Sequence, residues 1–280
     1  MGGRITGEVA DAIFHRYPES RYNHCFISVF NWLSAGGRTV FLQDANSLIM
    51  KTPDLIEGIL YLKASFPTIE RITSYARAKT VYKKSLKNMV EIRRAGLTRL
   101  HVGLETGDDE LLKKVRKGVS AEEHVAAGRK VVEAGIELSE YIMPGLGGRE
   151  MTEQHARNTA RVLNQINPHY IRSRPFAPIP GTPLAKECLE GDFAPLTCHE
   201  LLKEIGQLIE GLTVESRLCF DHAMNPCYRS RFGFTYLFDQ GYKGYALPDE
   251  KGRLLSIVKE GLLIEEEKFP GVEERAMMAR

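Results

Sequence analysis

The chain has 280 residues, of which 43% are hydrophobic and 26% charged, and its formal net charge is +2. This length fits one large α/β domain or two small ones, and the near balance of 38 basic and 36 acidic residues gives no indication of a nucleic-acid or membrane partner. No apolar run reaches the roughly 20 residues that cross a bilayer, and the chain does not open with a secretory signal pattern. Five cysteines without close pairs indicate free thiols in a reducing compartment, which predicts a cytoplasmic protein.

Predicted strands and helices alternate along the chain from residue 38 onward. Strands are expected at 38–44 and 70–76, within RRAGLTRLHVGLETG (93–107) and VEAGIELSEYIMPGLGG (132–148), and at 169–177. Helices are expected at 52–66, 85–96, 120–135 and 151–166. Thr52 before Pro53 is predicted to cap the first of these helices, and Ser120 with Glu123 has the capping-box pattern.

This alternation predicts an α/β fold with five parallel strands in sequence order and helices on one outer side. The strand at 38–44 is expected at an open edge of the sheet. We divide the chain into a first helix and linker (1–37), a βα core (38–211) and a small C-terminal α+β extension (212–280). Within the extension, the aromatic stretch 232–245 has no clear period and predicts a packed flap.

The ends of the predicted strands hold the candidate site residues. In parallel α/β folds the site lies at the carboxyl ends of the strands. RLHVGLETGDDELLKKVRKG (99–118) places Glu105 where a strand stops and Lys117 twelve residues later, after a predicted helical turn. The turn is expected to bring Lys117 back toward the strand end.

Three motifs occur in order at the ends of consecutive predicted strands: GLETGDDELLKKVRKG, PGLGG and RSRPFAPIPGTPL. Together they resemble the radical S-adenosylmethionine (SAM) superfamily, and most closely its coproporphyrinogen-oxidase and Elongator-like iron–sulfur enzymes. The resemblance extends over about residues 38–225. It implies a partial (β/α)6 TIM-like barrel and an oxidoreductase. Such an enzyme uses SAM and a [4Fe–4S] cluster to form a radical that acts on a small-molecule substrate.

The resemblance also implies roles for individual residues. Glu105 would bond the ribose or amino group of SAM, and Lys117 would pair with its methionine carboxylate. The further cofactor-binding candidates at the strand ends are Asp44, Asn46, Tyr75, Arg77, Tyr141 and Ala177. Arg174, Asp221 and His222 are the substrate-binding candidates.

The chain departs from this family at its front. The family holds its cluster with Cys-x3-Cys-x2-Cys after the first strand, and three thiolates leave one iron open for the ligand. This sequence has no such triplet, Cys25 stands alone, and 37 residues precede the strand at 38–44. We therefore expect an N-terminally truncated form that does not hold the cluster, and whether the chain is an enzyme depends on that loss.

Two alternatives remain open. The first is a non-catalytic SAM-binding or scaffold protein that has lost the cluster. The second is an ordinary TIM-barrel enzyme that acts on a phosphorylated metabolite at 144–148, and this would require eight βα units. The glycines of PGLGG suit either a tight turn or an anion cradle before the next helix.

A metal site in the tail is not predicted. Cys219, Asp221, His222 and Cys227 lie close in sequence, but their spacing supplies no second ligand pair of the kind that zinc sites use.

Overall fold

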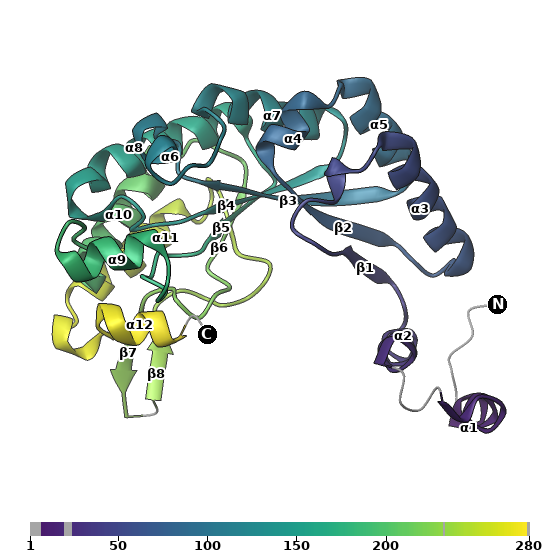
Figure 1. Ribbon diagram of the computed structural model, residues 1–280. Coiled ribbons are helices and arrows are strands. Elements are labelled where there is room, and N and C mark those ends of the chain that lie inside the picture. Colours follow the sequence, from purple (N-terminus) through teal and green to yellow (C-terminus); the bar gives the residue numbers. More distant parts are fainter. Residues whose placement is uncertain (1–6, 20–23, 232, 279–280) are drawn as a thin grey trace.

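The computed structural model of the protein describes residues 7–19, 24–231 and 233–278. Within these ranges, seven strands form one sheet in the order β1-β2-β3-β4-β5-β6-β9 (Figure 1). Their bounds are Thr39–Leu42 (β1), Arg71–Ala76 (β2), Leu97–Glu105 (β3), Glu137–Ile142 (β4), Tyr170–Ser173 (β5), Arg217–Cys219 (β6) and Tyr245–Ala246 (β9). Strands β1 to β6 pair in parallel, each with the next, and β9 pairs antiparallel with β6.

The α/β class and the sequential order of five parallel strands are therefore confirmed. β1 lies at an edge of the sheet, as predicted for the strand at 38–44. A sixth parallel strand, β6, was not among the predicted five. Both β6 and β9 come from the range 212–280, so part of the predicted extension joins the core sheet. The domain boundaries stay a prediction.

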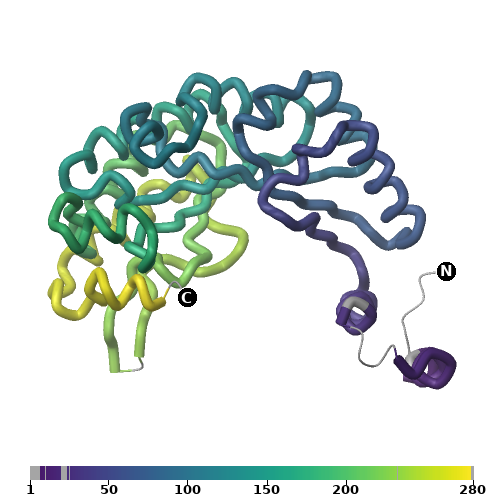
Figure 2. The backbone as a smooth tube through the Cα atoms, in the orientation of Figure 1, coloured from purple at the N-terminus to yellow at the C-terminus, as the bar shows by residue number. Residues whose placement is uncertain are grey.

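The helices that connect the strands lie on the outer side of the curved sheet, as predicted (Figure 1). They are α3 (Thr52–Ser65), α4 (Ala78–Lys83), α5 (Leu86–Ala95), α6 (Asp109–Lys114), α7 (Ala121–Glu133), α8 (Gly148–Ile166), α9 (Pro183–Glu190) and α10 (Cys198–Gly211). Neighbouring helices pack in the order α3, α5, α7, α8, α10, and they form the outer arc of the tube in Figure 2.

The two faces of β3 show why this arrangement positions a site. Leu100, Val102 and Leu104 are buried in the hydrophobic core. Because successive strand residues point to opposite faces, His101 and Gly103 lie on the inner face of the sheet. The face of β3 that carries the leucines and Val102 therefore packs in the core beneath the helices, and the opposite face is available for polar contacts.

Helix starts agree with the sequence in one case and differ in another. The capping box of Ser120 and Glu123 is present at the start of α7. The prediction that Thr52 caps α3 is wrong, because the helix begins at Thr52 and Lys51 occupies the cap position. The Thr52 hydroxyl accepts a hydrogen bond from Nζ of Lys84 at 3.1 Å, so it is engaged by another element.

The remaining elements lie outside this seven-stranded sheet. They are α1 (Gly7–Arg16), α2 (His24–Ser34), η2 (Ser47–Ile49), the hairpin of β7 (Cys227–Ser230) and β8 (Gly233–Tyr236), α11 (Lys251–Leu262), η3 (Glu266–Lys268) and α12 (Val272–Met278). In the stretch 232–245, of which residue 232 lies outside the described ranges, Phe238 is buried and stacks on Phe220 with ring centroids 3.8 Å apart.

No helix in the described ranges is long and apolar enough to span a bilayer. A cytoplasmic location stays a prediction.

Candidate functional site

A pocket of about 610 Å³ lies at the carboxyl ends of β1 to β4, and we call it the strand-mouth pocket. Parallel strands end at the same edge of a sheet, so residues far apart in sequence meet there. Six of the eight predicted cofactor-binding residues line it: Asp44, Tyr75, Arg77, Glu105, Lys117 and Tyr141. Its other charged or polar lining residues are Gln43, Lys79, His101 and Arg116.

The other two predicted cofactor-binding residues do not line this pocket. The side chain of Asn46 donates to the Thr80 hydroxyl at 2.9 Å and accepts from the backbone N–H of Arg77 at 3.1 Å. Asn46 thus fixes the backbone at the start of α4. Ala177 packs in a separate apolar cluster with Met224 and Ala276.

Glu105 and Lys117 form an ion pair inside the pocket. Nζ of Lys117 lies 2.9 Å from Oε1 of Glu105, and the two side chains are about a quarter exposed. Asp108 caps the short helix α6, and the backbone N–H of Lys117 then bonds the carbonyl of Leu112 at 2.9 Å. This turn returns the lysine to the end of β3, as the sequence predicts.

The backbone around the ion pair is unusual. Glu105 has φ of 61° and Arg116 has φ of 53°, which side chains other than glycine rarely adopt. A Cβ at Gly103 would lie 2.1 Å from Oε1 of Glu105 and 3.0 Å from Nζ of Lys117. Glycine at 103 therefore leaves the space that the ion pair occupies, and such strain commonly marks functional sites.

A buried hydrogen-bond network lies directly behind Glu105. The Thr106 hydroxyl is 2.8 Å from Nδ1 of His155, whose Nε2 is 3.2 Å from the carbonyl of Met143. The backbone N–H of Met143 in turn bonds the carbonyl of Glu105 at 2.9 Å. The network ties the ends of β3 and β4 together and so supports the left-handed conformation of Glu105.

The PGLGG turn is closed by an acid. The carboxylate of Glu204 accepts from the backbone N–H of Gly145 at 2.7 Å and from the Thr152 hydroxyl at 2.6 Å. Glu204 is buried, and this burial raises its pKa even though His155 and the two hydrogen bonds act in the opposite direction. The carboxyl group of Glu204 already occupies the backbone N–H of Gly145, which favours a tight turn over a phosphate cradle.

The predicted substrate-binding residues lie beside the pocket, at the ends of β5 and β6. Asp221 bridges two guanidinium groups, at 2.5 Å from Arg172 and 3.2 Å from Arg174. Burial works to raise the pKa of Asp221, but the two arginines outweigh it and hold that pKa below its usual range. Arg174 also lies over the Tyr141 ring, 5.0 Å from its centroid, which joins this cluster to the strand-mouth pocket. Nδ1 of His222 accepts from the backbone N–H of Met224 at 3.3 Å.

The thiols of the tail and of α10 are poorly suited to metal binding. Burial raises the pKa of Cys219 and of Cys227 to about 11, and that of Cys198 to about 12. Burial therefore favours the protonated thiols, and a metal or cluster would have to displace these protons in order to bind. The described residues contain no group of three or more side chains arranged to hold a metal ion.

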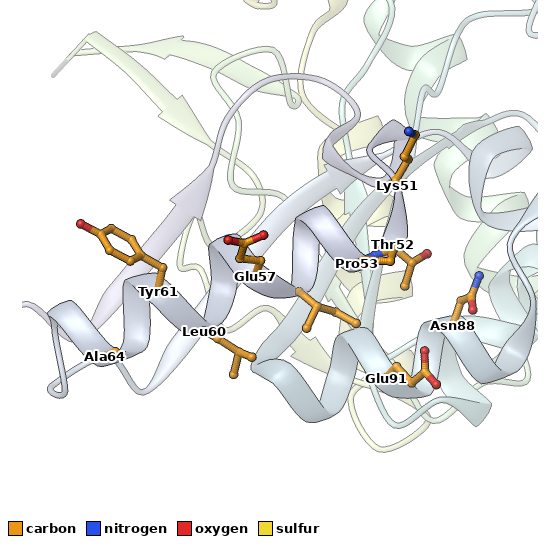
Figure 3. Close-up of a pocket in the computed structure, with 10 residues that line it drawn as sticks. Lys51, Thr52, Pro53, Glu57, Leu60, Tyr61, Ala64, Asn88 and Glu91 are labelled. Carbon is orange, nitrogen blue, oxygen red and sulfur yellow. The ribbon is translucent and has the colours of Figure 1, made fainter.

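A second pocket, of about 930 Å³, lies on the outer side of the sheet between α3 and α5 (Figure 3). Its lining includes the apolar side chains of Ile56, Leu60 and Tyr61. Its charged lining residues are Lys51, Glu57 and Glu91. None of the predicted ligand residues lines it. Size alone therefore does not make it the functional site.

His101 is a lining residue that the sequence reasoning missed. It lies four residues before Glu105, and the alternation of Leu100, Val102 and Leu104 already assigns it to the inner face. That periodicity is the signal that could have found it.

The position of His101 predicts a pH effect on stability. Burial, and then the guanidinium groups of Arg172, Arg99 and Arg174, lower its pKa to about 3, against a smaller opposite effect of Asp221. An unfolded histidine titrates near pH 6.5, so between these values the unfolded chain binds a proton that the folded chain does not. Protonation of His101 in the unfolded chain therefore lowers the free energy of unfolding as the pH falls from about 6.5 toward 3.

We expect the substitution His101→Phe to reduce the drop in melting temperature between about pH 7 and about pH 5. Thermal unfolding of both proteins across this range measures it. The carboxylates that also titrate in acid are common to both, so an equal drop in the two proteins would contradict the assignment.

Comparisons with known proteins agree with this geometry. Residues 31–162 match the family described as the radical SAM superfamily. The tRNA uridine(34) acetyltransferase of Methanocaldococcus infernus is 25% identical over 123 residues, 43% of this chain and 23% of that protein. A Methanocaldococcus jannaschii protein named "Probable threonylcarbamoyladenosine tRNA methylthiotransferase" is 32% identical over 90 residues, 31% of this chain and 20% of that protein. The chain spans about a fifth of the length of these relatives.

Among solved structures, the Elp3 protein of Methanocaldococcus infernus with an N-terminal deletion matches with a TM-score of 0.55 and 16% identity. The match covers 92% of this chain and 62% of that one. At this identity the likeness concerns the fold. It confirms the predicted α/β class with a TIM-like arrangement of parallel strands and outer helices.

Proposed function

We propose that this chain, which belongs to the radical SAM superfamily, binds SAM in the strand-mouth pocket. The observation that carries the proposal is the ion pair of Glu105 and Lys117, held in the pocket by two left-handed residues. Strained backbone is stable only where its surroundings enforce it, and the buried network behind Glu105 does so.

The chemistry of SAM suits the lining of this pocket. SAM carries an ammonium and a carboxylate at one end, a sulfonium in the middle and an uncharged nucleoside at the other end. Asp44 and Glu105 offer carboxylates, Lys117 offers a cation, and Tyr75 and Tyr141 offer aromatic rings. In the free protein Glu105 and Lys117 neutralise each other, so a zwitterion can replace each partner without leaving a buried charge unpaired.

The iron–sulfur cluster of the superfamily does not fit the described residues. Cys188, Cys198, Cys219 and Cys227 are free, and the side chain of Cys25 is outside the described part of the structure. Burial keeps three of these thiols protonated, and the sequence has no Cys-x3-Cys-x2-Cys. Radical cleavage of SAM needs the cluster, so the proposal for this chain is limited to SAM binding.

The predicted alternatives are affected differently. Catalysis on a phosphorylated metabolite at 144–148 loses support, because Glu204 closes that turn. A scaffold that has lost SAM binding is separated from our proposal by ligand titration. The curated relatives are named for modifications of tRNA, but the chain spans about a fifth of them, so the substrate is a separate question.

The test uses the chain purified anaerobically and treated with iron and sulfide. We expect well under one [4Fe–4S] cluster per chain by iron analysis, together with SAM binding in calorimetric titration that is weak because no iron chelates the ligand. No heat of binding at millimolar SAM would overturn the proposal. A stoichiometric cluster, with absorption near roughly 400 nm, would overturn our account of the cysteines.

A further inference from the structure

His101 is enclosed on the inner face of the sheet between two aromatic rings. The Phe41 ring is 5.8 Å from the imidazole at an interplanar angle of 9°, and the Tyr141 ring is 5.4 Å away at 7°. The residue is 2% exposed and lines the strand-mouth pocket. It is therefore a buried part of the pocket wall.

The imidazole has no hydrogen-bond partner in the described part of the chain, and its Nδ1 atom is fully buried. A buried polar atom without a partner destabilises a protein, and native structures contain few of them. A phenylalanine would stack between the same two rings without this cost. Folding alone thus gives no reason for histidine at this position.

The charges around His101 determine what it can bind. Arg172 and Arg174 share the single carboxylate of Asp221, which leaves one excess positive charge on this side of the pocket. The imidazole is neutral over the whole physiological range. The excess charge disfavours the ammonium and sulfonium groups of a ligand near His101, and those groups are favoured at Glu105 instead.

We propose that His101 is a specificity-determining residue of the strand-mouth pocket and hydrogen-bonds an uncharged hydroxyl of the ligand, in SAM a ribose hydroxyl. This inference rests on the proposed function. A neutral imidazole has one donor and one acceptor nitrogen, and a hydroxyl can both accept and donate, so either tautomer finds a partner. The carboxylate of the ligand is left to Lys117, and the pocket orients SAM with its nucleoside toward His101.

The decisive experiment removes the hydroxyls of the ligand and the imidazole of His101 separately. Adenosine and 2′,3′-dideoxyadenosine are titrated into the wild type and His101→Phe, with binding followed by ligand-observed NMR. We expect the wild type to bind 2′,3′-dideoxyadenosine about tenfold more weakly than adenosine. His101→Phe is expected to bind the two ligands with nearly equal affinity. His101→Gln, which keeps a neutral donor and acceptor, is expected to recover part of the difference. Methionine binding should be unchanged by His101→Phe and weakened by Lys117→Ala.

Stability measurements separate this role from a structural one. His101→Phe is expected to melt at the same temperature as the wild type or about 2–4 °C higher, since it removes an unpartnered polar group. His155→Phe is the matched control, because both ring nitrogens of His155 are bonded, and it is expected to melt lower. A lower melting temperature for His101→Phe as well would overturn the inference.

The outcomes also separate the inference from the proposed function. If the wild type binds neither SAM nor adenosine, both fail. If the wild type binds SAM, and the dideoxy analogue costs it and His101→Phe equally, the inference about His101 fails and the assignment of the pocket stands.

Discussion

Replacing Lys117 with alanine is expected to weaken SAM binding by about ten- to a hundredfold, because a charge-assisted hydrogen bond contributes about 1.5 to 3 kcal/mol. Glu105→Ala is expected to have an effect of the same size. Lys117→Arg should cost less than Lys117→Ala, since the ligand carboxylate needs a cation more than one particular geometry. Calorimetric titration of SAM into the wild type and the three variants measures these differences.

The control for this series is Lys113→Ala. Lys113 is exposed on the short helix α6, four residues before Lys117 in the sequence, and does not line the strand-mouth pocket. Lys113→Ala removes the same charge from the same stretch of chain but from outside the pocket, so it reports the effect of net charge alone. If the wild type binds SAM and neither alanine variant differs from Lys113→Ala, the ligand site lies elsewhere on the protein.

The order of the strands in the sheet could be predicted because the sequence signals that mark each helix end and strand start are local. Gly96 and Gly135 end helices with φ of 136° and 75°, and a strand follows each of them almost at once. Strands β6 and β9 contain three and two residues, which is too short for a periodic pattern to appear. They belong to the sheet because of what they pair with, and pairing is not encoded within so short a segment.

The sequence predicted most of the candidate residues that line the strand-mouth pocket, but not the contacts between them. The resemblance places Glu105 and Lys117 at the strand ends, but their ion pair depends on left-handed backbone and on the missing side chain of Gly103. Ala177 is a predicted cofactor-binding residue that does not line the pocket. It follows the end of β5 in sequence, yet it packs with Ala276 from the far end of the chain, and only the tertiary structure brings these two together.

Asp221→Ala is expected to give the largest loss of stability, about 3–5 kcal/mol, which corresponds to a fall of roughly 10 °C in melting temperature. The carboxylate of Asp221 bridges Arg172 and Arg174, and Arg172 is fully buried. Its guanidinium would keep a hydrogen bond to the Ser139 hydroxyl and its position over the Tyr242 ring, but would lose its anionic partner. Thermal and urea unfolding measure the loss.

The reason for this loss can be tested by removing the second charge as well. A buried ion pair contributes little net stability, while one buried charge left alone is costly. The double variant Arg172→Met with Asp221→Leu is therefore expected to be more stable than Asp221→Ala, although it carries more substitutions. Glu70→Ala breaks the exposed pair of Glu70 with Arg38 and should leave the melting temperature nearly unchanged. If the double variant is less stable than Asp221→Ala, the contacts of the Arg172 side chain, and not its unpaired charge, hold this part of the sheet together.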